Sequence, residues 1–367
     1  MGAQRAYGEG MTATSASREL AFLSFVPDDD GDPGEALRRG VRQFRDAEEL
    51  GYDAGWVRVR HFEPFLSAPL TFLAAVAAAT DRMHLGTGVL PMRYEDPIRT
   101  AEDAATLDLL SGGRLELGLS GGIAPLAGVL DEVFGASERG FDGEAQERIR
   151  RLRAALAGEP VAHATGPFST LPAGSDLRVT PHAPGLADRV WYGPGSVRSA
   201  RRTGEQGMDL QLSTLSGEFT GGSFEQGQAD QIRAYREGRA AAQDSGRATD
   251  APQRDPRIAV GRIVLPLLTA ADREAHRGFL DFYTNRMDER GRPREGSAPI
   301  QFGRIHAGSI DQIVDGLSRD PAVAEATTIS ITLPAPGGEV AHARVLESVA
   351  TAIAPQLGWN DGAATLT

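Results

Sequence analysis

Short apolar runs alternate with longer amphipathic stretches along most of the chain. The first apolar run, residues 20–26, has the length of a buried strand, and residues 33–50 carry apolar side chains at helical spacing. Asp32 and Pro33 mark the start of this helix, and Gly51 marks its end. The same order of strand and helix recurs up to the last apolar positions of the sequence.

This pattern predicts eight strands, each followed by helical spacing. The strands are expected at 20–26, 54–59, 84–90, 114–119, 189–192, 208–213, 258–267 and 327–333. Strict alternation indicates parallel strands joined by crossover helices, and eight such units close a (β/α)8 TIM barrel. The predicted fold class is therefore α/β, a single barrel domain with loop insertions on its active face. An open, doubly wound sheet is the alternative, because strand number alone does not exclude it.

The helices are expected between these strands and after the last one. Their predicted ranges are 33–50, 67–80, 97–111, 143–156, 197–205, 229–242, 268–290, 310–317 and 341–354. The barrel is expected to cover residues 19–360. Residues 1–18, which are small and polar, predict a disordered N-terminal tail, and 361–367 predict a C-terminal tail. The stretch 216–228, rich in Gly, Ser and Gln, is expected to be a loop on the active face.

Composition narrows the functional classes. The 367 residues are 41% hydrophobic, which is enough for a large core, and they include no cysteine. Disulfides, thiol nucleophiles and thiolate metal sites are therefore excluded. The net charge of −12 argues against a nucleic-acid partner. No apolar run approaches the about 20 residues that span a bilayer, and the N-terminus has no apolar secretory segment. A cytoplasmic protein without a membrane partner is expected.

The fifth predicted strand leads into a glycine-rich turn. Gly193 and Gly195 follow the strand, and Ser196 and Ser199 stand at the start of the next helix. Glycines let backbone N–H groups approach an anion, and a helix N-terminus adds partial positive charge. This arrangement predicts a phosphate cradle. A plain strand-to-helix turn capped by Ser196 is the alternative.

The second predicted strand ends in a cluster of basic residues. Arg58, Arg60 and His61 would lie at the mouth of the barrel, where active sites of this fold are found. Two arginines and a histidine suit an anionic substrate or the edge of a cofactor. Ion pairing with the acidic loop 28–30 is an equally open interpretation.

Other chemistry is less well supported by the spacing. Ser120 has glycines two residues before and after it, as a hydrolase nucleophile would, but a loop containing Pro125 follows instead of an immediate helix. A hydrolase remains an alternative. The remaining histidines lack ligand spacing, so no metal site is expected. The sequence has no lysine, which excludes a Schiff base on lysine.

Several segments together resemble the bacterial luciferase-like flavin monooxygenase family. The similarity is dense from about residue 20 to 122, continues at 193–207 and is weaker at 308–317. The segments that carry it are 47–53 (AEELGYD), Trp56-Val57, His61-Phe62, 85–91 (LGTGVLP), 96–99 (DPIR), 101–103 (AED) and 107–118 (LDLLSGGRLELG).

The resemblance implies a (β/α)8 barrel that binds FMN in its mouth. It implies that the FMN phosphate is cradled by Gly195, Ser196, Val197 and Ser199, beside Gly193.

For the flavin ring, the resemblance implies that Thr87 and Gly88 line the site and that the Gly88–Val89 peptide bond is cis. Ser120 stands where the family has a cysteine near the flavin.

The sequence also departs from the family pattern. Luciferases carry E-H-H-F after the second strand, and the first of these histidines is catalytic. Arg60 occupies that position here, and only the second histidine is kept, as His61, so aldehyde oxidation with light emission is not expected. His61 is the candidate acid/base, since the ordinary histidine pKa of about 6.5 suits proton transfer. Arg58 and Arg60 are expected to stabilise flavin or substrate anions.

The function expected from this resemblance is an FMN-dependent monooxygenase that uses reduced FMN and O2 on a small organic substrate. Reducing equivalents are expected from NAD(P)H, directly or through a partner flavin reductase, and a homodimer is expected. An F420-dependent hydride-transfer oxidoreductase and a catalytically silent flavin-binding relative are alternatives within the same fold. A phosphate-binding lyase or isomerase is the non-redox alternative.

Overall fold

The structure is a computed structural model that describes most of the predicted barrel. The described residues are 18–28, 31–122, 127–135, 137–166, 170–218, 222–245, 254–288, 291–294, 300–335 and 337–359. Apart from Arg18, the predicted tails 1–18 and 361–367 lie outside the described residues.

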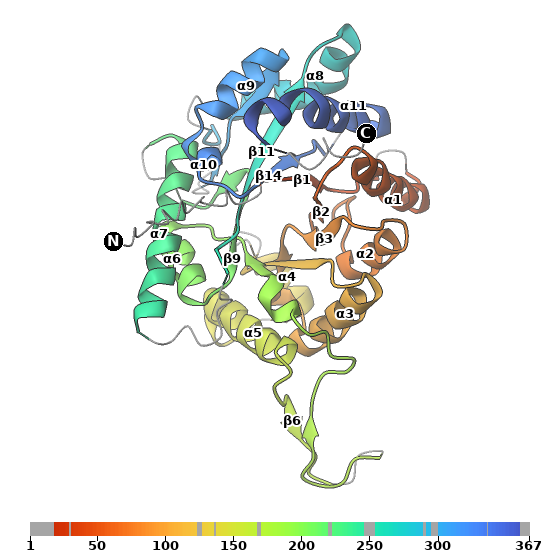
Figure 1. Cartoon of the computed structure of the whole chain (residues 1–367), viewed down its shortest axis with the longest axis vertical. Helices are drawn as coiled ribbons and strands as arrows, with labels where there is room; N and C mark the ends of the chain where they lie inside the picture. The colour runs from red at the N-terminus through yellow and green to blue at the C-terminus, as the bar shows by residue number, and fades with distance from the viewer. Residues whose placement is uncertain are drawn as a thin grey trace, which may run out of the picture.

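Eight parallel strands form a closed ring (Figure 1). Each strand pairs with its neighbours in the ring, and the first, β1, pairs with both the second and the last. Closure of the ring confirms the predicted (β/α)8 barrel and excludes the open sheet. The strands are β1 (Glu19–Ser24), β2 (Ala54–Val57), β3 (His84–Thr87), β5 (Leu115–Ser120), β8 (Val190–Tyr192), β9 (Asp209–Leu212), β11 (Ile258–Pro266) and β14 (Thr328–Thr332).

Helices surround this ring and bury their apolar faces against it (Figure 1). Several begin where capping residues supply acceptors for the free N–H groups: Asp32 accepts from Glu35, and Asp96 accepts from Ile98 and Arg99. The helices are α1 (Pro33–Glu49), α2 (Pro69–Ala77), α3 (Pro97–Leu110), α5 (Gly140–Leu156), α6 (Val197–Glu205), α7 (Phe224–Asp244), α8 (Ala270–Arg286), α9 (Ile310–Ser318), α10 (Pro321–Ala324) and α11 (Gly338–Ser348).

Most predicted boundaries differ from the structure by a few residues, and two of the differences change the description of the mouth. Helix α7 begins at Phe224, five residues earlier than expected, because the Ser223 side chain accepts the Gln226 N–H and caps it. The predicted loop 216–228 is therefore partly helical. The third strand also ends early: β3 stops at Thr87, and a short strand β4 (Leu90–Pro91) pairs with β5 further on.

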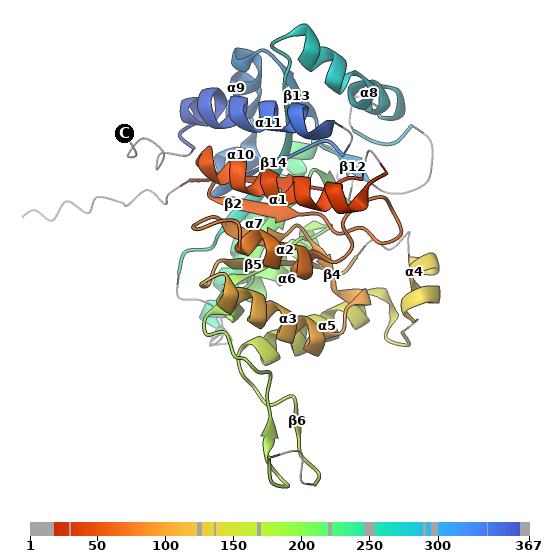
Figure 2. The ribbon, with the colours of Figure 1, turned by 90° about the vertical axis from the view of Figure 1, so that its right-hand side faces the viewer.

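The insertions in the barrel are small elements that periodicity did not predict. Helix α4 (Ala127–Phe134) lies at one edge of the molecule. The hairpin of β6 (Ala162–His163) and β7 (Asp176–Leu177) projects from the barrel at a different place (Figure 2). Three further short strands complete the set: β10 (Leu215–Ser216), β12 (Gln301–Phe302) and β13 (Ile305–Gly308). Two-residue strands are too short to produce a recognisable alternation.

The interior of the barrel is separate from the core beneath the helices. It is filled by small residues of β1, β2 and β11 around two tryptophans, Trp56 and Trp191, whose rings pack edge to face at 5.7 Å. Ala21, Leu23, Ala54 and Ala259 complete this cluster. Trp191 lies toward the amino end of the barrel, and Trp56 lies toward its carboxyl end, the mouth.

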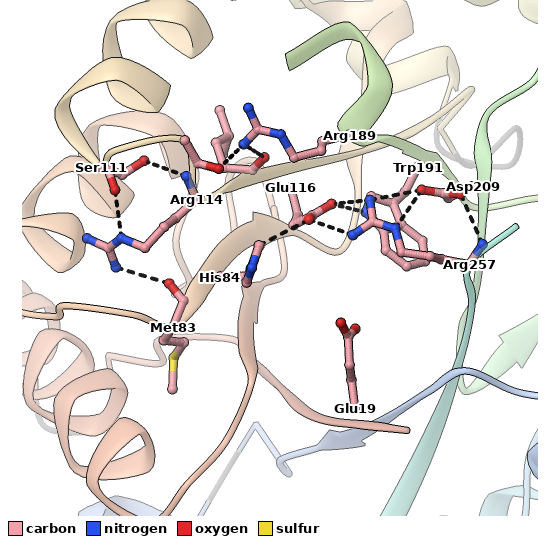
Figure 3. A network of polar contacts seen from close by, with 12 residues as sticks. Glu19, Met83, His84, Ser111, Arg114, Glu116, Arg189, Trp191, Asp209 and Arg257 are labelled. Atoms are coloured by element: carbon pink, nitrogen blue, oxygen red, sulfur yellow. Dashed lines mark hydrogen bonds and ion pairs between the residues drawn. The ribbon is translucent and has the colours of Figure 1, made fainter. Parts of the chain in front are cut away.

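A charged network closes the amino end of the barrel (Figure 3). The Glu116 carboxylate accepts hydrogen bonds of 2.7 Å from both terminal nitrogens of Arg257 and one of 2.5 Å from Trp191 Nε1. Arg257 also donates to Asp209 at 3.0 Å, and His84 Nδ1 lies 3.1 Å from Glu116. Burial alone would raise the pKa of Glu116, but His84 and Arg257 outweigh it and lower the pKa to about 2.

Among the described residues, no helix has both the length and the apolar character needed to cross a membrane.

Candidate functional site

A cavity of about 430 Å³ opens at the carboxyl end of the barrel. Each of the eight barrel strands, or the loop directly after it, contributes to its lining. This is the end at which TIM barrels carry their active sites, and the volume is typical of a small-molecule site. The lining residues are Leu23, Trp56, Arg58, Gly88, Val89, Ser120, Gly122, Gly193, Pro194, Gly195, Gln211, Leu212, Ser213, Leu215, Gly217, Gly261, Ile300, Ser330 and Thr332.

Three buried polar atoms in this lining have no hydrogen-bond partner in the described part of the chain. They are Trp56 Nε1, Gln211 Oε1 and Ser330 Oγ. All three side chains are more than nine-tenths buried. An unsatisfied buried polar atom costs about 1–3 kcal/mol. A ligand that supplies both donors and acceptors would be suited to these three side chains of the lining.

Bare glycines make room for the Gln211 carboxamide. A Cβ added at Gly118 would lie 2.3 Å from Gln211 Oε1 and 2.0 Å from the Thr87 carbonyl oxygen. A Cβ at Gly88 would lie 2.7 Å from Leu23. The Gly88–Val89 peptide bond is cis, as the resemblance implied. The backbone therefore reaches the cavity surface here without side chains in between.

Arg58 is a cation at this mouth with no carboxylate within ion-pair distance among the described residues. One terminal nitrogen of Arg58 donates to the Gly88 carbonyl oxygen at 3.5 Å. Burial, and then the neighbouring charge of Arg60, lower the pKa of Arg58 to about 10. The half-buried side chain faces the cavity, so its charge is available to an anion there.

A side chamber of about 260 Å³ adjoins this cavity and shares Arg58, Val89, Ser120 and Gly122 with it. Its remaining lining comes from the loop after β2, from β4 and the turn after it, and from α4: Val59, Arg60, His61, Phe62, Glu63, Pro91, Tyr94, Val129 and Leu130. Three more buried atoms without a hydrogen-bond partner in the described chain lie in this lining, namely Arg60 Nε, His61 Nε2 and Tyr94 OH; Arg60 Nε lies within ion-pair distance of Glu63. Burial lowers the pKa of His61.

The start of α6 is already occupied by a side chain of the protein. Ser196 and Ser199 form a capping box, in which each side chain accepts the backbone N–H of the other. The Val197 N–H donates to the Glu218 carboxylate at 2.8 Å. The Glu218 carboxylate therefore occupies the position at which the sequence predicts a phosphate. A phosphate would have to displace that carboxylate.

The predicted site residues fall into four groups. Those that line the main cavity are Arg58, Gly88, Ser120, Gly193 and Gly195, and those that line the side chamber include Arg60 and His61. Thr87 lies in the barrel wall, where its hydroxyl donates to the Gly118 carbonyl at 2.7 Å. Ser196, Val197 and Ser199 lie at the start of α6, directly after Gly195.

Sequence reasoning missed five residues of the site: Trp56, Tyr94, Gln211, Glu218 and Ser330. A signal existed for two of them. Gln211 lies between Leu210 and Leu212, and Ser330 lies between Ile329 and Ile331, so both are polar at inward-facing positions near a strand end. Nothing in the local pattern indicated that Glu218 would reach the start of α6.

The alternatives for the mouth are not favoured by the geometry. Arg60 Nε lies 3.8 Å from Glu63, and Asp28 Oδ1 has no partner in the described chain, so the expected pairing with the acidic loop is absent there; residues 29–30 lie outside the described residues. Ser120 Oγ accepts the Gly122 N–H at 3.2 Å, and α4 begins only at Ala127, which is not a nucleophile elbow. No group of three metal-ligating side chains occurs within the described ranges.

The family profile described as luciferase-like monooxygenase matches residues 19–332. The chain therefore belongs to the luciferase-like monooxygenase family.

Two curated proteins are similar over part of the chain. The 4-hydroxyprotoasukamycin monooxygenase of Streptomyces nodosus subsp. asukaensis is 32% identical over 207 residues, which cover 52% of this chain and 55% of that protein. The limonene 1,2-monooxygenase of Rhodococcus erythropolis is 30% identical over 195 residues, which cover 49% of each. The chain thus spans about half the length of these relatives.

Solved structures share the fold over almost the whole chain. A monooxygenase from Streptomyces bottropensis has 19% identity and a TM-score of 0.67, and the match covers 92% of this chain and 99% of that one. The FMN-bound oxygenating constituent of 3,6-diketocamphane monooxygenase from Pseudomonas putida has 16% identity and a TM-score of 0.66, with 92% and 98% covered. The F420-dependent tetrahydromethanopterin reductase of Methanopyrus kandleri has 15% identity and a TM-score of 0.63, with 93% and 99% covered. These identities establish a common fold.

Proposed function

We propose that this protein is a monooxygenase that binds reduced FMN in the main cavity and uses O2 to oxidise a small organic substrate. The observation that carries the proposal is the set of three unpartnered buried atoms around that cavity, on Trp56, Gln211 and Ser330. The isoalloxazine ring of a flavin has a polar edge of alternating donors and acceptors, which suits such a set. Two similar curated proteins are monooxygenases by name, which supports the same reaction class.

The residues at the cavity fit FMN at both ends. Gln211, Ser330 and Trp56 would hold the polar edge of the ring, and the bare backbone at Gly88 leaves room for its face. The start of α6 would hold the phosphate once Glu218 leaves it. When bound, reduced FMN supplies the electrons that activate O2.

The protein's own residues have separate tasks in this proposal. Leu23, Leu212 and Val89 line the cavity and exclude water from it. Arg58 places a positive charge where an anion on flavin or substrate needs it. His61 can accept or give a proton at Nε2, which has no partner in the described chain. Because burial lowers the pKa of His61, the ring is neutral at pH 7 and accepts a proton there.

FMN is favoured over F420 by the charge around the mouth. The tail of F420 carries several carboxylates and needs a basic surface beyond the ring. Among the described residues that line the main cavity, Arg58 is the one basic residue, and the Glu218 carboxylate stands at the start of α6. We propose further that reduced flavin reaches this cavity from an NAD(P)H-dependent reductase.

Anaerobic titration of the purified protein tests the cofactor. FMN, reduced FMN, riboflavin and F420 are titrated separately, and an oxygen pulse then follows the reoxidation of bound flavin. We expect reduced FMN to bind more tightly than F420, and we expect Gln211→Ala to weaken its binding about tenfold through loss of a buried hydrogen bond. The exposed Gln226→Ala is the matched control and should bind as the wild type does.

Three results would contradict parts of the proposal. Binding of F420 alone would move the protein to hydride transfer. Flavin binding without oxygen-dependent turnover of any substrate would indicate a silent relative. Equal flavin binding by the Gln211 variant and by the wild type would show that the main cavity is not the flavin site.

A further inference from the structure

The side chamber opens directly into the main cavity. The two share four lining residues, so a molecule in the chamber touches the space assigned to the flavin. Arg58 and Ser120 lie at this junction and face both volumes. The chamber also has its own set of unpartnered buried atoms, which the flavin site does not explain.

Part of the chamber lining is apolar. Val89 and Pro91 contribute to it, as do Val129 and Leu130 of α4. Phe134 packs behind them, with its ring centroid 4.9 Å from His61, 5.6 Å from Tyr94 and 5.9 Å from Phe62. These rings lie around a compact space of about 260 Å³. Such a space suits a ring compound better than a long flexible chain.

The charge of the chamber is positive although the whole chain is acidic. Arg58 and Arg60 both line it, against one carboxylate, Glu63. Glu63 lies 3.8 Å from Arg60 and its side chain is 45% exposed, so it neutralises little of the charge inside. Arg58 has no carboxylate within ion-pair distance in the described chain. A ligand with one negative charge would therefore be drawn to the junction.

We propose that the side chamber is the substrate subsite and that its substrate is a compact ring compound carrying one acidic oxygen, as a phenolate, enolate or carboxylate. The ring lies between Val89 and Leu130, and the acidic oxygen pairs with Arg58 at the junction. Tyr94 OH and His61 Nε2 are then free to bond a second polar group of the substrate. This inference rests on the proposed function, since it places the substrate beside the flavin cavity.

Three probes test the substrate class on the wild-type protein. They are 2-naphthoate, its neutral amide 2-naphthamide, and octanoate, which keeps the carboxylate and lacks the ring. Equilibrium dialysis without flavin gives the three dissociation constants. We expect 2-naphthoate to bind at least about tenfold more tightly than either of the others, because a charge-assisted bond and ring burial are then both present.

Two variants of α4 locate the binding. Leu130→Trp fills the chamber and should abolish 2-naphthoate binding, while FMN binding stays as in the wild type. Glu132→Trp is the matched control, since Glu132 is exposed on the same helix and does not line the chamber. Tyr94→Phe removes only the unpartnered hydroxyl; because naphthoate has no second polar group, its binding should change little.

The outcomes separate this inference from the proposed function. Equal binding of 2-naphthoate and 2-naphthamide, or unchanged naphthoate binding in Leu130→Trp, overturns the substrate subsite even if FMN binds normally. Selective naphthoate binding that Leu130→Trp abolishes supports the subsite even if FMN fails to bind. Should Leu130→Trp not fold, the comparison of the three probes on the wild type still decides the substrate class.

Discussion

The two ends of the barrel treat buried charge in opposite ways. At the amino end, Glu116 is bonded to Arg257, which also bonds Asp209 (Figure 3). At the mouth, Arg58 has no carboxylate within ion-pair distance in the described chain, and polar atoms of Gln211 and Ser330 lack partners. The pKa shifts follow: that of Glu116 falls to about 2 because its charge is stabilised, and that of Arg58 falls to about 10 because its charge is not. The charges of the amino end stabilise one another, and the mouth is the end at which we propose that a ligand binds.

Removing a charge at the amino end should have the largest effect. Glu116→Gln leaves Arg257 buried against Trp191 with one carboxylate fewer, so we expect the free energy of unfolding to fall by about 3–5 kcal/mol. Urea denaturation measures this. The control is Glu147→Gln on the exposed face of α5, which should change stability very little. A loss at Glu116 no larger than the control's would show that the network is not a stabilising one.

The same carboxylate predicts a pH dependence. The pKa of Glu116 is lower in the folded protein than the usual 4.5, so its stabilisation is complete above pH 4.5. It is lost as the pH falls from 4.5 towards 2, because the folded state must then take up a proton. Denaturation midpoints measured across this range should fall less steeply for Glu116→Gln. Identical slopes for the variant and the wild type would contradict the assignment.

Removing the charge at the mouth should not lower the free energy of unfolding, in contrast to the change at the amino end. Arg58→Met eliminates a half-buried cation that has no carboxylate within ion-pair distance in the described chain, so the free energy of unfolding should stay the same or rise by up to about 2 kcal/mol. Binding of 2-naphthoate should fall at the same time. Urea denaturation and dialysis on one preparation give both values. A clear loss of stability would mean that Arg58 is structural and that the two ends do not differ as described.

The third change concerns the phosphate end of the mouth. Glu218→Gln removes the negative charge at the start of α6 and keeps a side chain of similar size. FMN should then bind about three- to tenfold more tightly, and riboflavin, which has no phosphate, should bind as before. Fluorescence titration with both flavins measures the difference. Equal gains for FMN and riboflavin would show that Glu218 does not compete with phosphate.

The smallest expected effect is confined to α4. The buried Arg93 holds this helix through Asp131, with bonds of 2.6 and 2.9 Å, and also donates to the carbonyl oxygens of Gly140 and Phe141. Asp131→Asn weakens the two bonds between Arg93 and α4 because it removes the negative charge of the acceptor. Hydrogen exchange of α4 should become faster while exchange of the barrel strands stays unchanged. Acceleration throughout the barrel would contradict a local role.

Much of the architecture was predictable because it depends on local patterns. The apolar period, the caps at Asp32 and Asp96 and the glycine stops mark the boundaries of most strands and helices, and eight repeats indicate a closed ring. Glycines and arginines after the strands could be assigned to the mouth because parallel strands end on one side. Helix α4 and the short strand pairs were missed, since a few residues carry too little periodic signal.

The order of strands and helices, the family and the candidate residues at the strand ends follow from the sequence, because spacing and turn chemistry are local properties. The pairing of charges does not. Whether Arg257 meets Glu116, whether Gln211 is left without a partner, and whether Glu218 reaches Val197 all depend on strand register and loop paths. Strand register and loop paths bring together groups that are far apart in the chain. Only the distances in the folded protein show which polar atoms have a hydrogen-bond partner and which do not.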